Sequence, residues 1–274
     1  MIGNTKLIEF IQGQIDKGTF PRFSIIVGKK GSGRKTLANK IFTMFDKGVF
    51  AEVGTGIADV REMIAEAHRL VGVRSVYLIP DADDMSTPAQ NALLKVVEEP
   101  PNNAYFIMTL EDVHNVLETI QSRGNTYVVQ NCTKSQIQEY AKETCGLSGK
   151  ALEIVTRFCE TIGEVNDLVQ YGPAEFNKFM LLVADNIDSV SLANALKIAE
   201  KVAVKDEADK YSLKMFLTAF LTICGERMVE DVKYMEWSLI TSKALKKLHT
   251  IRGINKQMVF DDWVFDVREW ADGG

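Results

Sequence analysis

A glycine-rich stretch between an apolar run and a helical pattern is the first part of the sequence that could do chemistry. It follows the β-branched run 23–27 and reads Gly28-Lys29-Lys30-Gly31-Ser32-Gly33-Arg34-Lys35-Thr36. Such loops bind phosphate because glycines let backbone N–H groups converge on it, a lysine reaches the β- and γ-phosphates, and a serine or threonine hydroxyl binds Mg²⁺. The placement, after a strand and at the start of a helix, indicates a loop of the nucleotide-binding kind.

The residue types at the chemical positions of this loop do not suit nucleotide chemistry. With Gly28 and Gly33 at the two glycine positions, Arg34 takes the place of the lysine and Lys35 that of the magnesium-binding hydroxyl. The planar guanidinium of arginine does not replace a compact ammonium, and Lys35 brings a cation where one is already needed. The shifted register that uses Lys35 and Thr36 puts charged residues on the glycine positions. Neither register is intact.

A second apolar run, 76–79, ends in Pro80 and Asp81. An ATPase of this kind ends the equivalent strand with an Asp that orders Mg²⁺ and a Glu that activates the attacking water. Pro80 has no ligand atom, and Asp81 is one methylene shorter than the Glu. We therefore expect no ATP hydrolysis by this chain and no required cofactor, with ATP and Mg²⁺ binding doubtful. The alternative is that Asp81, Asp83 and Asp84 form a solvated acidic turn at a helix start.

The elements that must position these residues follow from the hydrophobic pattern. Continuous apolar runs at 23–27, 76–79, 104–109 and 127–129 alternate with helical patterns, which predicts an α/β domain with a parallel sheet covered on both faces. After about residue 130 only helical periodicity remains, and Leu213, Phe216, Phe220 and their neighbours form one broad helix face. We expect an α/β core over 1–130 and two helical units over 131–185 and 186–274.

The composition narrows the class of protein. The chain has 274 residues, of which 46% are hydrophobic and 25% are charged, as in an ordinary globular protein. It has no apolar run of the roughly 20 residues needed to span a bilayer, and its first residues lack the order of a signal peptide. We expect a cytoplasmic chain with no membrane partner.

Net charge and cysteine spacing limit its ligands. The net charge of −5 argues against a generally basic surface for nucleic acid, so any DNA contact must be focal. The basic cluster in and after the glycine loop, whose residues are given below, could position DNA phosphates or be an exposed loop without a ligand. The four cysteines have no C-x-x-C spacing, so we expect buried free thiols and no metal site. The cluster comprises Lys29, Lys30, Arg34, Lys35 and Lys40, and the cysteines are Cys132, Cys145, Cys159 and Cys224.

Two further motifs complete a family resemblance. The string N-A-L-L-K-V-V-E-E-P-P occupies 91–101, and Ser122-Arg123 follows the next apolar run. Together with the glycine loop and the strand end at Asp81, they resemble the AAA+ clamp-loader subunits of DNA polymerase III over residues 20–130. The resemblance implies a P-loop-type AAA+ core, a helical lid over 131–185 and a helical oligomerisation collar over 186–274. The stretch 252–258 resembles the start of the last collar helix.

Within that family the chain resembles the δ′ type. The family's motor subunits keep the loop lysine, the Asp-Glu pair and a sensor-2 arginine, whose position here reads Asn166. The δ′-type subunit has a decayed site and retains a Ser-Arg-Cys motif. This chain keeps Ser122-Arg123 but has Gly124 for the Cys, lacks the four-cysteine zinc module of many members, and places Thr109 at or beside the sensor-1 position.

The resemblance implies a role in DNA replication. It makes Arg123, beside Ser122, an arginine finger that reaches the γ-phosphate of ATP bound to a neighbouring subunit. The implied partners are the motor subunits and a δ-like subunit, with the sliding clamp and primer-template DNA reached through the complex. The implied function is that of a non-hydrolysing subunit in clamp loading. Two alternatives are an atypical but active ATPase motor and an AAA+-fold adaptor outside replication.

Overall fold

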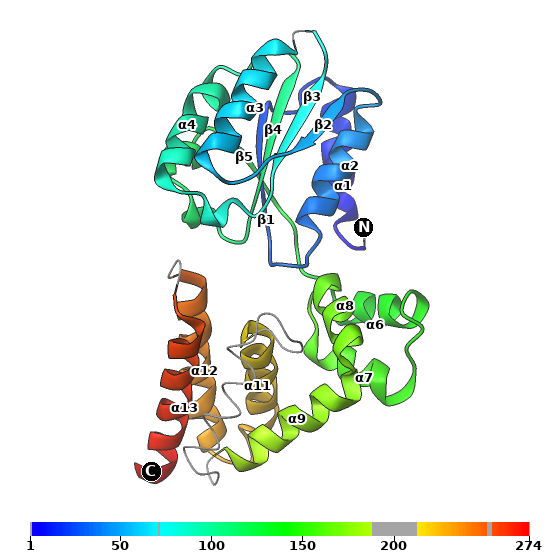
Figure 1. Ribbon diagram of the computed structural model, residues 1–274. Coiled ribbons are helices and arrows are strands. Elements are labelled where there is room, and N and C mark those ends of the chain that lie inside the picture. Colours follow the sequence, from blue (N-terminus) through cyan, green and yellow to red (C-terminus); the bar gives the residue numbers. More distant parts are fainter. Residues whose placement is uncertain (1, 71, 188–212, 251–253, 274) are drawn as a thin grey trace. The chain divides into compact units, whose positions relative to one another are not determined.

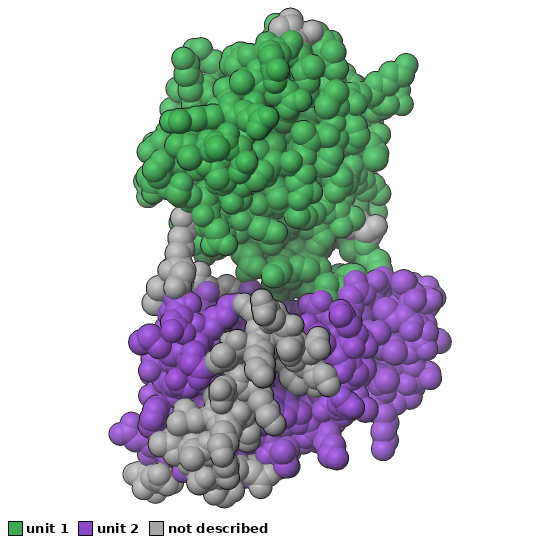
Figure 2. Space-filling model, viewed as in Figure 1, with its two compact units in different colours: residues 1–136, 161–163 green, residues 137–160, 164–274 purple. Residues whose placement is uncertain are grey.

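The computed structural model describes residues 2–70, 72–187, 213–250 and 254–273 of the chain (Figure 1). The chain divides into two compact units, which are coloured separately in Figure 2. The first unit contains residues 1–136 and 161–163, and the second contains 137–160 and 164–274. The predicted boundary between lid and collar, at 185 and 186, lies within the second unit beside residues outside the described ranges, so this division stays a prediction.

The first unit is built on a parallel sheet of five strands in the order β2-β3-β4-β1-β5. The predicted parallel sheet is confirmed, and three of its runs coincide with β1, β3 and β4. The fourth run, 127–129, begins two residues after the start of β5 and ends one residue after its end. The sequence does not predict β2, because it is a short edge strand without a buried run. The strands are β1 (Phe23–Val27), β2 (Val49–Glu52), β3 (Ser75–Ile79), β4 (Ala104–Leu110) and β5 (Asn125–Val128).

Helices cover both faces of the sheet (Figure 1). Alternate residues of each central strand point to opposite faces: Phe23 and Ile25 pack with α3, α4 and α5, whereas Ile26 packs with α1 and α2. Both faces of the sheet are therefore buried, as the continuous apolar runs require. The helices are α1 (Thr5–Asp16), α2 (Arg34–Met44), α3 (Ile57–Arg69), α4 (Thr87–Glu98) and α5 (Glu118–Gln121), with 3₁₀ turns η1 (Ala82–Asp84) and η2 (Val113–Asn115).

The described part of the second unit is helical, as predicted. Phe216 and Phe220 of α11 are fully buried against Trp263 of α13, with ring centroids 5.5 and 4.9 Å apart. The predicted apolar face of α11 thus lies inside this unit. Arg252 and Gly253 of the predicted collar motif lie outside the described residues. The helices are α6 (Lys134–Glu143), α7 (Gly149–Phe158), α8 (Ile162–Tyr171), α9 (Pro173–Asn186), α11 (Leu213–Arg227), α12 (Lys233–Thr250) and α13 (Lys256–Gly273). None of the described helices is long and apolar enough to cross a membrane.

Candidate functional site

The glycine loop lies where three central strands end. Residues 28–33 follow β1, Pro80 and Asp81 follow β3, and Glu111 follows β4. Because these strands are parallel, their carboxyl ends meet at one edge of the sheet, which is where α/β proteins bind ligands. Gly33 has a φ of 99° and precedes the first turn of α2, so the loop enters the helix through a left-handed residue. The structure therefore brings the predicted loop, Asp81 and Glu111 to the same end of the sheet.

The loop is closed by a distant segment, 161–163. The backbone N–H of Gly163 donates to the carbonyl of Gly31 over 3.0 Å. Gly31 has a φ of 80°, and a Cβ there would lie 2.7 Å from Thr161 Oγ1 and 2.9 Å from Gly163 Cα. The N–H of Ser32 donates to the carbonyl of Lys29. Part of the loop backbone is therefore hydrogen-bonded within the protein, and its contact with 161–163 leaves room only for glycine.

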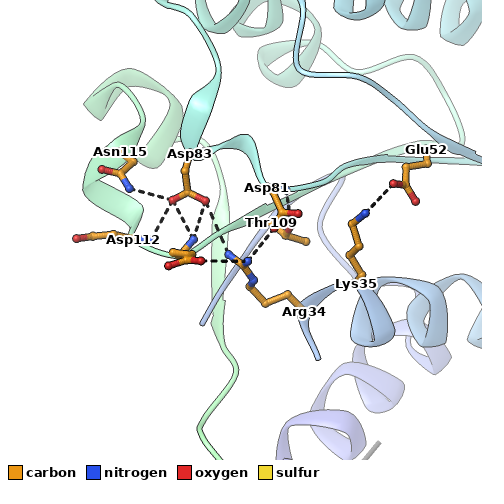
Figure 3. Close-up of polar contacts among 9 residues, drawn as sticks. Arg34, Lys35, Glu52, Asp81, Asp83, Thr109, Asp112 and Asn115 are labelled. Atoms are coloured by element: carbon orange, nitrogen blue, oxygen red, sulfur yellow. Dashed lines mark hydrogen bonds and ion pairs between the residues drawn. The ribbon is translucent and has the colours of Figure 1, made fainter. Parts of the chain in front are cut away.

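Arg34, at the lysine position of the loop, is directed toward the chain's own carboxylates (Figure 3). Its Nη2 lies 2.7 Å from Asp81 Oδ1 and 4.0 Å from Glu111 Oε1, and its side chain is only 5% exposed. Its Nη1 lies 3.8 Å from Asp83 Oδ2, too far for a hydrogen bond, and this buried nitrogen has no hydrogen-bond partner among the described residues. The positive charge at this position is therefore balanced from within the chain.

Asp81 is held in an unusual backbone conformation. Its φ of 46° and ψ of 47° are left-handed, which is costly for a residue with a Cβ. Its N–H donates to the hydroxyl of the fully buried Thr109 over 2.9 Å. Thr109, expected at or beside the sensor-1 position, therefore holds the backbone of Asp81, while the Asp81 carboxylate pairs with Arg34.

Asp83 is a structural centre of the same edge, a role that the sequence did not reveal. It accepts hydrogen bonds from the backbone N–H groups of Glu111 and Asp112 and from Asn115 Nδ2 (Figure 3). Its side chain is 17% exposed. The alternative of a solvated acidic turn is therefore wrong for Asp83, because this carboxylate fixes the segment after β4. The only local signal was its position four residues after β3.

The other basic loop residues differ in their surroundings. Lys35, at the hydroxyl position, makes an exposed ion pair with Glu52 at 2.8 Å (Figure 3). Thr36 and Lys30 are exposed, and Lys40 is partly buried. Focal contact with DNA stays a prediction.

Among the residues that the structure describes, no group of three or more His, Cys, Asp or Glu side chains is arranged to hold a metal ion.

Asn166, expected at the sensor-2 position, belongs to the second unit. It lies on α8, and its Oδ1 accepts a hydrogen bond from the hydroxyl of Tyr140 on α6. A neutral amide that joins two helices in this way is a structural contact. Its position in the sequence was predicted from the family resemblance, and its partner was not.

Ser122 and Arg123 lie at the opposite edge of the sheet from the loop. They precede β5, whose Asn125 pairs with Ser24 near the start of β1, so they occupy the amino ends of the strands. Both residues are exposed. A Cβ on Gly124 would lie 2.6 Å from Ile25 Cδ1, so the residue after the arginine packs directly against the central strand. This close packing accounts for glycine where the resembling family has cysteine.

The cysteines only partly match the prediction of buried thiols. Cys159 and Cys224 are buried, but Cys132 and Cys145 are partly exposed, so the prediction is wrong for these two. All four are free thiols. Burial raises the pKa of the Cys224 thiol to about 12, and desolvation also raises the pKa of Cys132 and of Cys145.

The chain is similar to several subunits of DNA polymerase III. Residues 51–133 match the family model of the DNA polymerase III delta subunit. The chain is 22% identical to the DNA polymerase III subunit gamma of Buchnera aphidicola, over 92% of this chain and 76% of that protein. It is 29% identical to the subunit delta′ of Haemophilus influenzae over 39% of this chain and 32% of that protein. Both a gamma and a delta′ subunit of DNA polymerase III are therefore similar to this chain.

Solved structures confirm the fold. A gamma subunit-related protein of DNA polymerase III from Thermotoga maritima superposes with a TM-score of 0.55 at 17% identity, covering 96% of this chain and 99% of that one. The RuvB Holliday junction branch migration motor of the same organism gives 0.53 at 15% identity, covering 83% and 76%. The expected AAA+ P-loop-type α/β fold with a helical C-terminal region is thereby confirmed. Relatives of both the gamma and the delta′ kind match, so the comparisons do not distinguish between these two kinds of subunit.

Proposed function

We propose that this chain is a δ′-like clamp-loader subunit that hydrolyses no ATP itself and supplies Arg123 to the nucleotide site of a neighbouring motor subunit. The observation that carries the proposal is the contrast between the two edges of its sheet. At one edge Arg34, at the catalytic lysine position, is paired with Asp81 at the catalytic glutamate position, 2.7 Å apart. At the other edge Arg123 is exposed beside Ser122.

The residues of the loop edge do not fit ATP with Mg²⁺. The N–H of Ser32 already donates to the carbonyl of Lys29, so it is not available to a phosphate oxygen. Pro80 offers no metal ligand, and the charge of Arg34 is balanced by Asp81. A nucleotide would have to displace these internal contacts. No hydrolytic step is therefore assigned to this chain.

An exposed arginine can act on ATP held by another subunit. The transferred phosphoryl group develops charge on its oxygens in the transition state, and a guanidinium placed against it stabilises that charge. A subunit that cannot hydrolyse ATP has no use for such an arginine in its own site. The presence of Ser122-Arg123 in a chain whose glycine loop is decayed supports action in trans on a motor subunit during the loading of a sliding clamp onto primer-template DNA.

Steady-state ATP hydrolysis by the complex of this chain with the gamma-type subunit of the same genome tests the proposal. At equal assembly, Arg123→Ala should lower turnover about 10-fold or more at the served site, the low end of arginine-finger effects diluted by intact sites. Arg34→Ala should change turnover far less. Unchanged turnover in Arg123→Ala would remove the finger role and favour an adaptor outside replication.

An active motor is the second candidate, because the gamma subunit of Buchnera aphidicola aligns with 92% of this chain, against 39% for the delta′ subunit of Haemophilus influenzae. This candidate predicts ATP turnover by the isolated chain. In it, Arg34 or the shifted pair Lys35 and Thr36 would have to serve the phosphates. The first prediction in the Discussion separates the two candidates.

A further inference from the structure

Arg123 is held by two contacts on its own subunit. Its Nη2 donates to Glu98 Oε1 over 3.1 Å, and its Nη1 donates to the backbone carbonyl of Thr119 over 2.9 Å. Two of the five guanidinium N–H donors are used in this way, and the other three have no partner among the described residues. The side chain is therefore held in place while part of its hydrogen-bonding capacity faces outward.

Glu98 stands on a rigid support. It is the last residue of α4, and the following Glu99, ahead of Pro100, has left the helical conformation with a φ of −126° and a ψ of 72°. Buried Gln90 of the same helix accepts a hydrogen bond from the N–H of Leu117, immediately before α5. Helix α4 thus holds the start of α5 through Gln90, and it holds the guanidinium of Arg123, which follows α5, through Glu98.

The residue type at position 98 is unfavourable for the helix itself. The carbonyl end of a helix carries a partial negative charge, so a glutamate in the last turn is destabilising unless a cation compensates. Lys95, the only basic residue in the last turn of α4, has no ion pair with Glu98 among the described contacts, whereas Arg123 does. The Glu98 carboxylate is unfavourable at the carbonyl end of α4, and its ion pair with Arg123 compensates for this.

We propose that Glu98 is a positioning residue, which preorganises Arg123 for the γ-phosphate of the neighbouring subunit; this inference rests on the proposed function. A free arginine side chain samples many rotamers, and their loss must be offset when the guanidinium docks. Glu98 and Thr119 restrict these rotamers before the neighbour arrives, which lowers the entropic part of the barrier. The ion pair is exposed, with Glu98 58% and Arg123 33% accessible. Its effect on turnover should therefore be about two- to fivefold.

Charge-removing variants in the assembled complex test the proposal. Glu98→Gln should lower kcat for ATP about two- to fivefold without changing the KM, because the finger acts on the transition state. Glu99→Gln is the matched control, since Glu99 is the exposed neighbour with no described ion pair, and it should leave kcat unchanged. In an Arg123→Ala background, Glu98→Gln should have no further effect. Equal kcat in Glu98→Gln and Glu99→Gln, a rise in Glu98→Gln, or an undiminished loss in the Arg123→Ala background would each overturn the proposal.

A measurement on the isolated full chain separates failure of this inference from failure of the finger role. In NMR spectra of ¹⁵N,¹³C-arginine-labelled protein, rotation of the Arg123 guanidinium about its Cζ–Nε bond should be slower in the wild type than in Glu98→Gln. Equal rotation would overturn the positioning contact even if Arg123→Ala lowers turnover. Slowed rotation together with unchanged turnover in Arg123→Ala would overturn both the finger and its positioning.

Discussion

Arg34 Nη2 and Asp81 Oδ1 lie 2.7 Å apart, although the two residues are 47 positions apart in the sequence. Arg34 follows the glycine loop after β1, and Asp81 follows the end of β3, which β4 separates from β1 in the sheet. Each occupies a position where resembling ATPases hold a group that works on ATP. In this chain the two side chains bind each other directly. The buried guanidinium of Arg34 and the more exposed carboxylate of Asp81 thus join α2 to the end of β3.

The isolated chain should hydrolyse no ATP above background with Mg²⁺ present. The reason is that Pro80 supplies no metal ligand and Asp81 is engaged with Arg34. A coupled-enzyme assay on the purified chain checks this. Mg²⁺-dependent turnover on the order of 1 s⁻¹ that disappears in Lys35→Ala would show an active motor.

Arg34→Ala should lower the free energy of unfolding by about 1 to 3 kcal/mol, because it leaves partly buried carboxylates without their cation. The loss should be less than for a fully buried pair, since Asp81 is 57% exposed. Lys35→Ala is the control. It breaks an ion pair with Glu52 in which both side chains are about half exposed, and it should cost about 0.5 kcal/mol or less.

Urea unfolding of both variants, followed by circular dichroism, gives the comparison. Similar losses for Arg34→Ala and Lys35→Ala would mean that the Arg34 pair contributes no more than a surface contact. The two-unit chain should be analysed by the transition of the α/β unit, since the units need not unfold together.

Gly31→Ala should destabilise the α/β unit more than Gly18→Ala. Both glycines have a positive φ, of 80° and 66°, so both substitutions carry a backbone cost of about 1 to 2 kcal/mol. Only at Gly31 would the new Cβ meet other atoms, at 2.7 Å from Thr161 Oγ1, whereas nothing lies within 4 Å at Gly18. Hydrogen exchange at the Gly163 amide, which donates to Gly31, should also accelerate in Gly31→Ala. Equal destabilisation with unchanged exchange would contradict the close contact.

Stability should fall with rising pH between about 9 and 12 partly through Cys224. Burial raises the pKa of this thiol from its ordinary value of 9.0 to about 12. Below pH 9 the thiol is protonated in both states, so it adds no pH dependence; above pH 9 only the unfolded chain loses the proton, which favours unfolding. In Cys224→Ala the slope of the unfolding free energy should be shallower by up to about 1.4 kcal/mol per pH unit. Denaturation midpoints at pH 8.5, 9.5 and 10.5 test this, and parallel slopes would contradict it.

The sequence predicted the parts of this fold that have local signals. Central strands such as β3 are continuous apolar runs because both sheet faces are covered, and the glycine loop is recognisable from its residue types. The edge strand β2 has only intermediate or exposed residues, so it gives no such run. The closure of the loop by Gly163 and the pairing of Arg34 with Asp81 join segments distant in the sequence. No periodicity or spacing within one segment encodes such contacts.

The glycine loop and the Ser122-Arg123 motif lie at opposite ends of the strands, so the α/β unit has two different ends. A strand of five residues such as β1 is about 16 Å long. A single small contact with a neighbouring protein therefore cannot include both the glycine loop and the Ser122-Arg123 motif. In a head-to-tail row, each member offers an arginine to one side and receives one at its nucleotide site from the other. A chain that offers an arginine and has no working site to receive one would terminate such a row of active sites. Its position would determine where the row ends and how many of its sites hydrolyse ATP.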